Sequence, residues 1–165
     1  LGGSVYAYQN DEDSRCTGTS TPCALSVNGN SANNEFRLYE GFSQIDIGGL
    51  PMPLSFYGQY VKNNDAVTDA DTAWLVGAKS KVFGLNLDYN YRDVQRDAVV
   101  GAFTDSDFAN GTTGSRGHKF KVGYDIDKNF AIGATYFLTK ADYSSAPNYR
   151  DAKVNTLQLD AEAKF

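Results

Sequence analysis

Polar side chains that could contact ions or small solutes recur at every second position in several segments of this chain. Between residues 85 and 92, apolar residues alternate with Asn86, Asp88, Asn90 and Arg92. A period of two places alternate side chains on opposite faces of a β-strand, so these polar groups share one face. On the inner wall of a membrane barrel, such a face would select permeating ions or solutes by charge. The alternative is a polar interior whose charges pair across strands and merely fill the barrel.

The same alternation continues toward the C-terminus and completes the set of candidate pore-lining residues. We expect these to be Asn86, Asp88, Asn90, Arg92, Lys119, Lys121, Asp125, Gln158, Asp160 and Glu162. If the connection at residues 97–116 closes symmetrically, Arg92 lies near Lys121. Asp88 then lies near Asp125, which predicts a basic level above an acidic one.

Residues suited to catalysis are few. His118 is the single histidine, and it shares the apolar face with Phe120 and Val122, which points it away from a lumen. It therefore lies out of reach of a substrate that would need a general base there. The sequence contains no Gly-x-Ser-x-Gly motif and no phosphate-binding loop. We expect no enzymatic activity and no cofactor.

Acidic residues gather in the long polar stretches of the chain. They are Asp65, Asp69, Asp71, Asp105 and Asp107. Such carboxylates could collect a divalent cation, or contact lipopolysaccharide through one, but the spaced ligands and glycine of a calcium loop are absent. Solvated loop charge is the expected role, and we predict no metal site.

Net charge and cysteine usage narrow the function classes further. The formal net charge is −5, which argues against a nucleic-acid partner because phosphate binding needs clustered Lys and Arg. Cys16 and Cys23 lie in a polar segment without a nearby histidine, so a metal site is disfavoured. A small loop disulfide formed in an oxidising compartment is the prediction, and free thiols are the alternative.

Composition alone fits either a soluble β-sandwich or a membrane barrel. The chain is 41% hydrophobic, and no stretch approaches the roughly 18 consecutive apolar residues of a membrane helix. Alternating strands average out to a polar composition, which leaves barrels open. The expected strands cover residues 1–9, 35–48, 53–62, 72–80, 85–92, 118–126, 130–138 and 154–165. The apolar phase shifts between Phe42 and Ile45, which predicts a bulge near residues 41–43.

Short and long connections alternate between these segments. The short ones cover residues 48–53, 79–82 and 127–129, and the long, polar ones cover residues 10–34, 63–71, 97–116 and 141–152. Outer-membrane barrels have short periplasmic turns and longer extracellular loops, and lipid requires a sheet without open edges. The pattern predicts an antiparallel up-and-down transmembrane β-barrel with about eight strands in this chain, either complete or part of a larger barrel.

Aromatic residues on the apolar faces favour the same interpretation. We expect a lipid-facing girdle made of Tyr89, Tyr91, Tyr124, Phe130, Tyr136 and Phe165. In a soluble sandwich, the same rings would be buried beneath a second sheet. The last strand ends on Phe165, as outer-membrane barrels commonly do, and we expect the barrel-assembly machinery to recognise that strand.

Three segments carry a resemblance to a known family. They are residues 71–79 (DTAWLVGAK), 91–108 (YRDVQRDAVVGAFTDSDF) and 117–124 (GHKFKVGY). Together they resemble the C-terminal part of the putative porin family of Gram-negative outer membranes, over residues 38–165. The stretch at residues 97–108 is the most specific of these, because a generic barrel does not require it.

The resemblance implies a function and a set of partners. It implies passive diffusion of small hydrophilic solutes or ions, contact with outer-membrane lipid and lipopolysaccharide, and a possible homo-oligomer. Members of the family are usually longer, so residues 1–165 are expected to form one barrel domain or the C-terminal fragment of a longer porin. The alternative function is a small structural or adhesive barrel, without an open pore, whose extracellular loops bind a partner.

Overall fold

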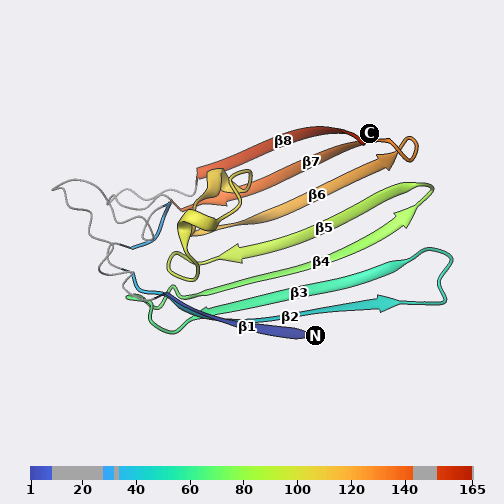
Figure 1. Ribbon diagram of the computed structural model, residues 1–165. Coiled ribbons are helices and arrows are strands. Elements are labelled where there is room, and N and C mark those ends of the chain that lie inside the picture. Colours follow the sequence, from blue (N-terminus) through green and yellow to red (C-terminus); the bar gives the residue numbers. More distant parts are fainter. Residues whose placement is uncertain (9–27, 32–33, 143–151, 165) are drawn as a thin grey trace.

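The computed structural model describes residues 1–8, 28–31, 34–142 and 152–164. Eight strands form one antiparallel sheet in which each strand pairs with its neighbours in sequence (Figure 1). The strands are β1 Gly2–Ala7, β2 Arg37–Ile47, β3 Leu54–Asn63, β4 Thr72–Val82, β5 Leu85–Val94, β6 Ser115–Asp125, β7 Phe130–Ala141 and β8 Ala152–Ala163. Two short 3-10 helices, η1 Gly101–Phe103 and η2 Ala109–Gly111, lie between β5 and β6. The all-β antiparallel prediction is confirmed.

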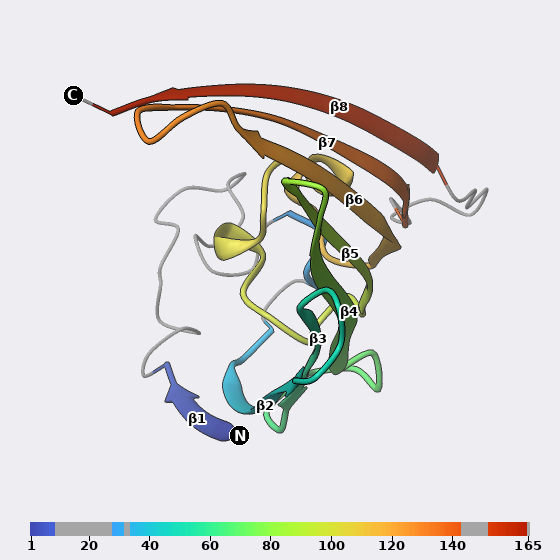
Figure 2. The same cartoon turned by 90° about the vertical axis from the view of Figure 1, so that its right-hand side faces the viewer.

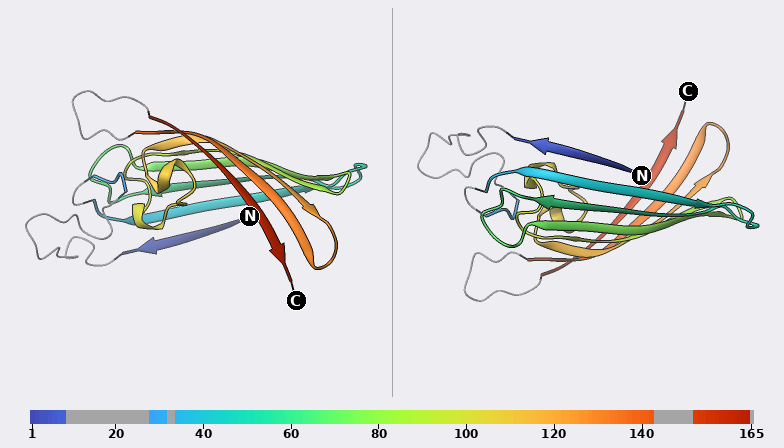
Figure 3. Two further views of the ribbon diagram at one scale, coloured as in Figure 1. Left: turned by 90° about the horizontal axis from the view of Figure 1, so that it is seen from above. Right: turned by 90° about the horizontal axis from the view of Figure 1, so that it is seen from below.

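The sheet curves into an arch whose edge strands are β1 and β8 (Figure 2). Strands β7 and β8 run obliquely to β2, β3 and β4 (Figure 3), as the right-handed twist of β-strands requires. Within the described residues, β1 and β8 do not pair with each other. The strands therefore have the geometry of a partial barrel wall.

Connections of different length lie at opposite ends of the sheet. Residues 48–53, 83–84 and 126–129 make the turns of the short-turn end, and the longer connections lie at the other end, here the long-connection end (Figure 1). The tightest turn uses Phe83 and Gly84, whose φ angles of 50° and 80° suit a two-residue hairpin turn that needs positive φ at both positions. The alternation of short and long connections is confirmed, but the turn expected at residues 79–82 lies at residues 83–84, because β4 continues to Val82.

The two faces of the sheet differ in polarity. Residues opposite one another in register share a face, and the convex face carries most of the exposed large apolar side chains of the strands. They include Phe56, Trp74, Leu87, Phe120, Ile132, Leu157 and Leu159. Leu157 and Leu159 are 63% and 75% exposed, which fits a surface whose natural neighbour is lipid rather than water.

The predicted bulge near residues 41–43 is wrong. Pairing of β2 with β3 runs without interruption from Leu38 opposite Asn63 to Ile47 opposite Leu54. The apolar phase shifts because Phe42 lies on the concave face, opposite Gly2 of β1. Its ring occupies the space that a side chain at Gly2 would fill, so an inward aromatic residue explains the sequence pattern without a backbone irregularity.

Residues 95–114, here the inward loop, lie inside the concavity at its long-connection end (Figure 2). Phe108 and Ala109 of this loop form a buried cluster with Phe137 and Ala141 of β7. Val100 packs in a second cluster with Phe36 and Leu38. The buried apolar side chains therefore lie where the loop meets the wall.

In the part of the chain that the structure describes, no helix is long and apolar enough to cross a membrane.

Candidate pore wall and constriction

The inward loop rests on the concave wall through an aromatic contact. The rings of Phe108 and Phe137 meet edge to face, with centroids 6.3 Å apart, a favoured geometry for aromatic pairs. Both side chains are buried. A loop joining β5 to β6 is thereby held against β7, so it crosses part of the concavity instead of extending into solvent.

Arg92 joins the wall to the same loop. Its Nη2 donates to Oδ2 of Asp105 at 2.8 Å, and its guanidinium lies 3.8 Å from the ring centroid of Phe108. The Arg92 side chain retains 17% exposure. Planar guanidinium groups suit both contacts, because they pair with carboxylates and stack on aromatic rings. Arg92 therefore fixes the position of the loop.

The environment of Asp105 favours its charged form. Burial raises the pKa of this carboxyl, but the hydrogen bonds from Arg92 and from the backbone N–H of Asp107, together with the positive charges of Arg92 and Lys119, lower it by more. The net pKa lies below the ordinary value of 3.8. The contact between Asp105 and Arg92 is therefore an ion pair at neutral pH.

Residues 28–31 also hold the inward loop in place, through hydrogen bonds. The Asn30 side chain donates to the carbonyls of Arg96 and Val99, at 2.7 and 3.0 Å, and accepts from the backbone N–H of Gly101 at 2.8 Å. The carbonyl of Asn28 accepts from the backbone N–H of Thr113 at 2.7 Å. The sequence did not reveal this role, because residues 10–34 have the mostly polar composition of a solvated connection.

Asp97 joins three connections through hydrogen bonds, a role that the sequence pattern does not reveal. It is fully buried. Its carboxylate accepts from the backbone N–H of Ser31 and the hydroxyl of Thr68, both at 2.7 Å. Its carbonyl accepts from the Asn63 side chain at 2.7 Å. The one available signal was its place at the start of the specific segment at residues 97–108.

The wall below the loop carries opposite charges in alternation. Asp88 of β5 lies opposite Lys79 of β4 and Lys121 of β6. The expected pairing of Arg92 with Lys121, and of Asp88 with Asp125, is wrong. Arg92 lies opposite Gly117, a shift of four residues, because β6 begins at Ser115 and the connection closes over residues 95–114. The wall thus mixes charges at this level.

Tyr57 is a wall residue that the polar pattern did not reveal. Its hydroxyl lies 2.5 Å from Oδ1 of Asp88, two strands away, and accepts from the Asn90 side chain at 3.1 Å. The intervening β4 residue is Gly77, where a side chain would collide with the Tyr57 ring. Lys79 lies over the same ring, with Nζ 4.6 Å from its centroid.

The remaining candidate pore-lining residues also lie on the concave face. Lys119 is opposite Asn90, with Nζ 5.3 Å from the centroid of the Phe137 ring. Toward the short-turn end, Asp125 accepts from Lys81 and Asn86, at 3.3 and 3.2 Å. On β8 the carboxylate of Asp160 accepts from Gln158 at 3.0 Å, and Glu162 pairs with Lys164 at 3.1 Å. Candidate residues on β4, β5 and β6 therefore contact one another, whereas those on β8 have partners within residues 158–164.

The expected girdle residues lie on the opposite, convex face. By register, this face holds Tyr89, Tyr91, Tyr124, Phe130 and Tyr136. His118 shares it, with Nδ1 2.9 Å from the Tyr89 hydroxyl. Phe165 and the two cysteines, Cys16 and Cys23, lie outside the described residues. In the described part of the chain, no cluster of three or more His, Cys, Asp or Glu could hold a metal ion.

An antiparallel meander that is apolar on its convex face and polar on its concave face is the architecture of β-barrel membrane proteins, and in some of them a loop enters the barrel. A sequence model of the family described as "Putative porin" matches residues 21–165. The chain belongs to this putative porin family, whose general role is that of a porin in the outer membrane. No curated protein and no solved structure matched the chain.

Proposed function

We propose that the concave wall and the inward loop form part of a channel through which small hydrophilic solutes or ions diffuse passively across the outer membrane of a Gram-negative cell. One observation carries the proposal: a loop held by Arg92 and Asn30 narrows a concavity that is lined by polar side chains. The apolar convex face supports the orientation, with lipid outside and solute inside. The long connections then face the extracellular side.

The barrel that we propose has more strands than the eight of this sheet. An eight-stranded barrel leaves an interior that side chains fill, whereas water-filled porins use about 16–18 strands. This arch already accommodates the inward loop, and its edges at β1 and β8 need partners because lipid offers none. We propose that residues 1–165 are the C-terminal part of a longer barrel domain, with further strands pairing at those edges.

Charge on the wall is proposed to act on the permeating solute. Lys119 and Lys121 lie below the inward loop, while Asp125, Asp160 and Glu162 lie toward the short-turn end. Below the loop, a solute entering from the long connections would meet Lys119 and then the level shared by Lys121 and Asp88. The mixed lining supports a general diffusion route rather than a single tight binding site.

The remaining roles are proposed on the same basis. The convex tyrosines would anchor the barrel at the lipid interfaces. As an edge strand, β8 offers backbone groups to the barrel-assembly machinery. A homo-oligomer is also proposed, and we propose that the protein acts without catalysis and without a cofactor.

Conductance in planar lipid bilayers tests this function. Folded protein inserted into the bilayer should give discrete ion-permeable steps. Silence from protein that is shown to be folded by heat-modifiable migration would contradict the proposal and favour a structural or adhesive barrel.

A further inference from the structure

Aromatic rings are exposed inside the concavity, beside the inward loop. Phe103 of η1 is 70% exposed, and Tyr6 of β1 is 47% exposed. Both residues line a cleft of about 400 Å³ between the inward loop and the concave wall, here the lumen cleft. Contact between apolar groups and water is unfavourable, and an exposed apolar surface with polar groups at its edge is typical of a ligand-binding groove. The lumen cleft is therefore a candidate solute site on the proposed channel.

Packing against the core holds the exposed ring of Phe103 in place. The ring centroid of Tyr8 lies 6.4 Å from that of Phe103 and 6.2 Å from that of Phe36. Phe36 is buried in one cluster with Val100, the residue that directly precedes η1. The contacts of Tyr8 and Val100 therefore limit the movement of Phe103, although most of its surface is exposed. A ring that is already positioned loses little freedom when a ligand binds to it.

Hydrogen-bonding groups line the same cleft. Arg92 and Asp105 belong to its lining, and their ion pair carries no net charge. It nevertheless offers guanidinium N–H donors and carboxylate acceptors side by side. The side chain of Gln59, which donates to Glu40, also lines the cleft, and its carbonyl oxygen is a further acceptor. The polar groups of the lumen cleft thus suit a neutral ligand whose groups both donate and accept.

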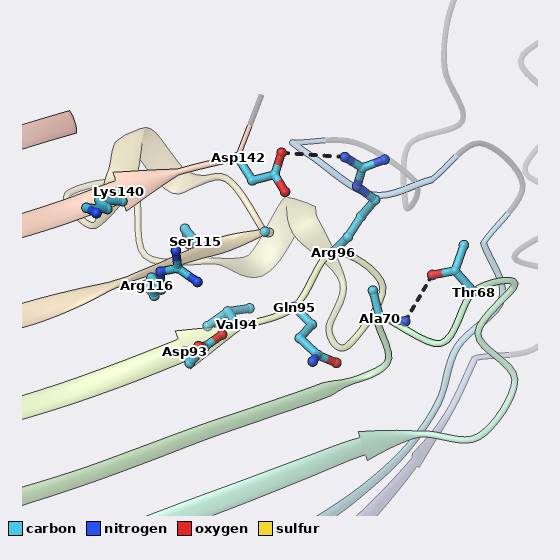
Figure 4. A pocket seen from close by; sticks show the side chains of 11 residues that line it. Thr68, Ala70, Asp93, Val94, Gln95, Arg96, Ser115, Arg116, Lys140 and Asp142 are labelled. Atoms are coloured by element: carbon cyan, nitrogen blue, oxygen red, sulfur yellow. Dashed lines mark hydrogen bonds and ion pairs between the residues drawn. The ribbon is translucent and has the colours of Figure 1, made fainter. Parts of the chain in front are cut away.

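A neighbouring cleft at the rim of the sheet has a different composition. It has a volume of about 900 Å³ and shares Val94 and Ser115 with the lumen cleft (Figure 4). Among the described residues its lining contains no aromatic side chain, and Nη2 of Arg96 lies there 3.8 Å from Oδ1 of Asp142. Of these two clefts, the lumen cleft alone combines aromatic rings with donors and acceptors.

We propose that the lumen cleft binds the pyranose ring of a small sugar. A pyranose ring presents C–H groups on its faces, which can stack on Phe103 and Tyr6, and hydroxyls around its rim, each of which donates and accepts. The cleft volume lies within the range of small-molecule sites, about 300–1,000 Å³. Binding is weak, because a solute that crosses a channel must also leave its sites.

The two sides of the cleft favour a sugar over other small solutes. An aromatic hydrocarbon could stack on Phe103, but it would cover Arg92 and Asp105 without replacing their hydrogen bonds to water, which is costly. A charged solute would meet an ion pair that is already neutral. The inference rests on the proposed function, because it names the class of solute that the channel prefers.

A glucose titration of the full chain tests the site. The protein is folded in a detergent without a sugar headgroup, and saturation-transfer NMR measures the dissociation constant of D-glucose. Phe103→Ala removes the most exposed ring of the cleft and should weaken binding about three- to tenfold, the range of one aromatic contact. Phe103→Tyr keeps a ring and should bind glucose like the parent protein. Phe83→Ala removes a phenylalanine that is 98% exposed in the β4–β5 turn, and it should also bind like the parent.

Two further probes test the chemistry of the ligand. Sorbitol carries hydroxyls on an open chain without a ring face, so it should bind more weakly than glucose and respond little to Phe103→Ala. Equal binding of glucose and sorbitol, or glucose binding that Phe103→Ala leaves unchanged, would overturn the inference. Benzyl alcohol that binds more tightly than glucose and depends on Phe103 would assign the cleft to aromatic solutes, and this result would overturn it as well.

Conductance measured on the same samples separates this inference from the proposed function. Glucose should reduce the current through the open channel, and Phe103→Ala should remove much of that block. A silent channel whose glucose binding depends on Phe103 contradicts only the pore. An open channel that glucose does not affect contradicts only the sugar site.

Discussion

Arg92 of the wall and Asp105 of the inward loop form an ion pair, with Nη2 2.8 Å from Oδ2. The two residues lie on opposite sides of the boundary between β5 and the inward loop, so the pair sets how far the loop crosses the concavity. Phe108 covers the guanidinium from the loop side. The width of the proposed channel therefore depends on one charged contact in addition to the aromatic packing.

Breaking this pair should widen the channel. Arg92→Gln should weaken the attachment of the loop by about 1–2 kcal/mol, between the values for exposed and buried ion pairs. Single-channel conductance should rise and become noisier, since the loop gains freedom. Arg37→Gln, which removes the ion pair with Asp65 at 3.0 Å outside the concavity, is the matched control and should leave conductance unchanged. Equal effects of the two variants would show that the loop does not constrict the channel.

Acid should release the loop in the same way. The pKa of Asp105 is lower in the folded protein than its ordinary value of 3.8. A carboxyl whose pKa is lowered by folding stabilises the folded state at pH values above its pKa in the unfolded chain. That stabilisation is lost as the pH falls through the pKa of the folded state. Conductance should be steady above about pH 4 and rise below it. Asp105→Asn should already show the higher conductance at neutral pH and should lack this acid transition.

The hydrogen bonds that Asp97 makes to three connections should stabilise the fold. Asp97→Ala leaves the backbone N–H of Ser31 and the hydroxyl of Thr68 without their acceptor. Each buried donor left without an acceptor costs about 1–3 kcal/mol, so we expect a loss of about 3 kcal/mol in the free energy of unfolding. Urea unfolding in detergent measures it. Asp107→Ala, at an exposed position of the same loop, should change stability by less than about 0.5 kcal/mol. An equally small change in the free energy of unfolding for Asp97→Ala would show that Asp97 does not hold the three connections together.

A charged residue introduced on the convex face should destabilise the protein in membranes. Leu159→Asp places a carboxylate on the lipid-facing surface and should lower stability in membranes by at least about 1 kcal/mol. Thr156→Asp adds the same group on the concave side of the same strand and should be tolerated. The yields of folded protein in lipid vesicles compare the two variants. A normal yield of folded Leu159→Asp protein would contradict the assignment of the convex face to lipid.

The sequence predicted what depends on local periodicity. The strands and their faces follow from a period of two, which places Asn86, Asp88, Asn90 and Arg92 together on one face. Register was less accessible, because it depends on where the connection between β5 and β6 closes, and the expected partner of Arg92 was wrong by four residues. The sequence pattern predicts a bulge that β2 does not contain, because Phe42 is an apolar residue on the polar, concave face.

Contacts between distant segments could not be predicted from the pattern. Tyr57 reaches Asp88 only because the strand between them carries Gly77, a relation that requires the register of three strands. Asn30 holds the inward loop from a connection whose polar composition resembles ordinary solvated loop. Tertiary position, rather than residue type, gives these side chains their roles.

The central claim is that the concave face lines an aqueous channel and the convex face meets lipid. Lys121 and Val122 are adjacent on β6 and lie on opposite faces. In a background with Cys16→Ser and Cys23→Ser, Lys121→Cys should react with a charged, water-soluble thiol reagent, and the reaction should change the conductance of the open channel. Val122→Cys should remain unreactive and its conductance constant. Reaction at both positions, or at Val122 alone, would contradict the account.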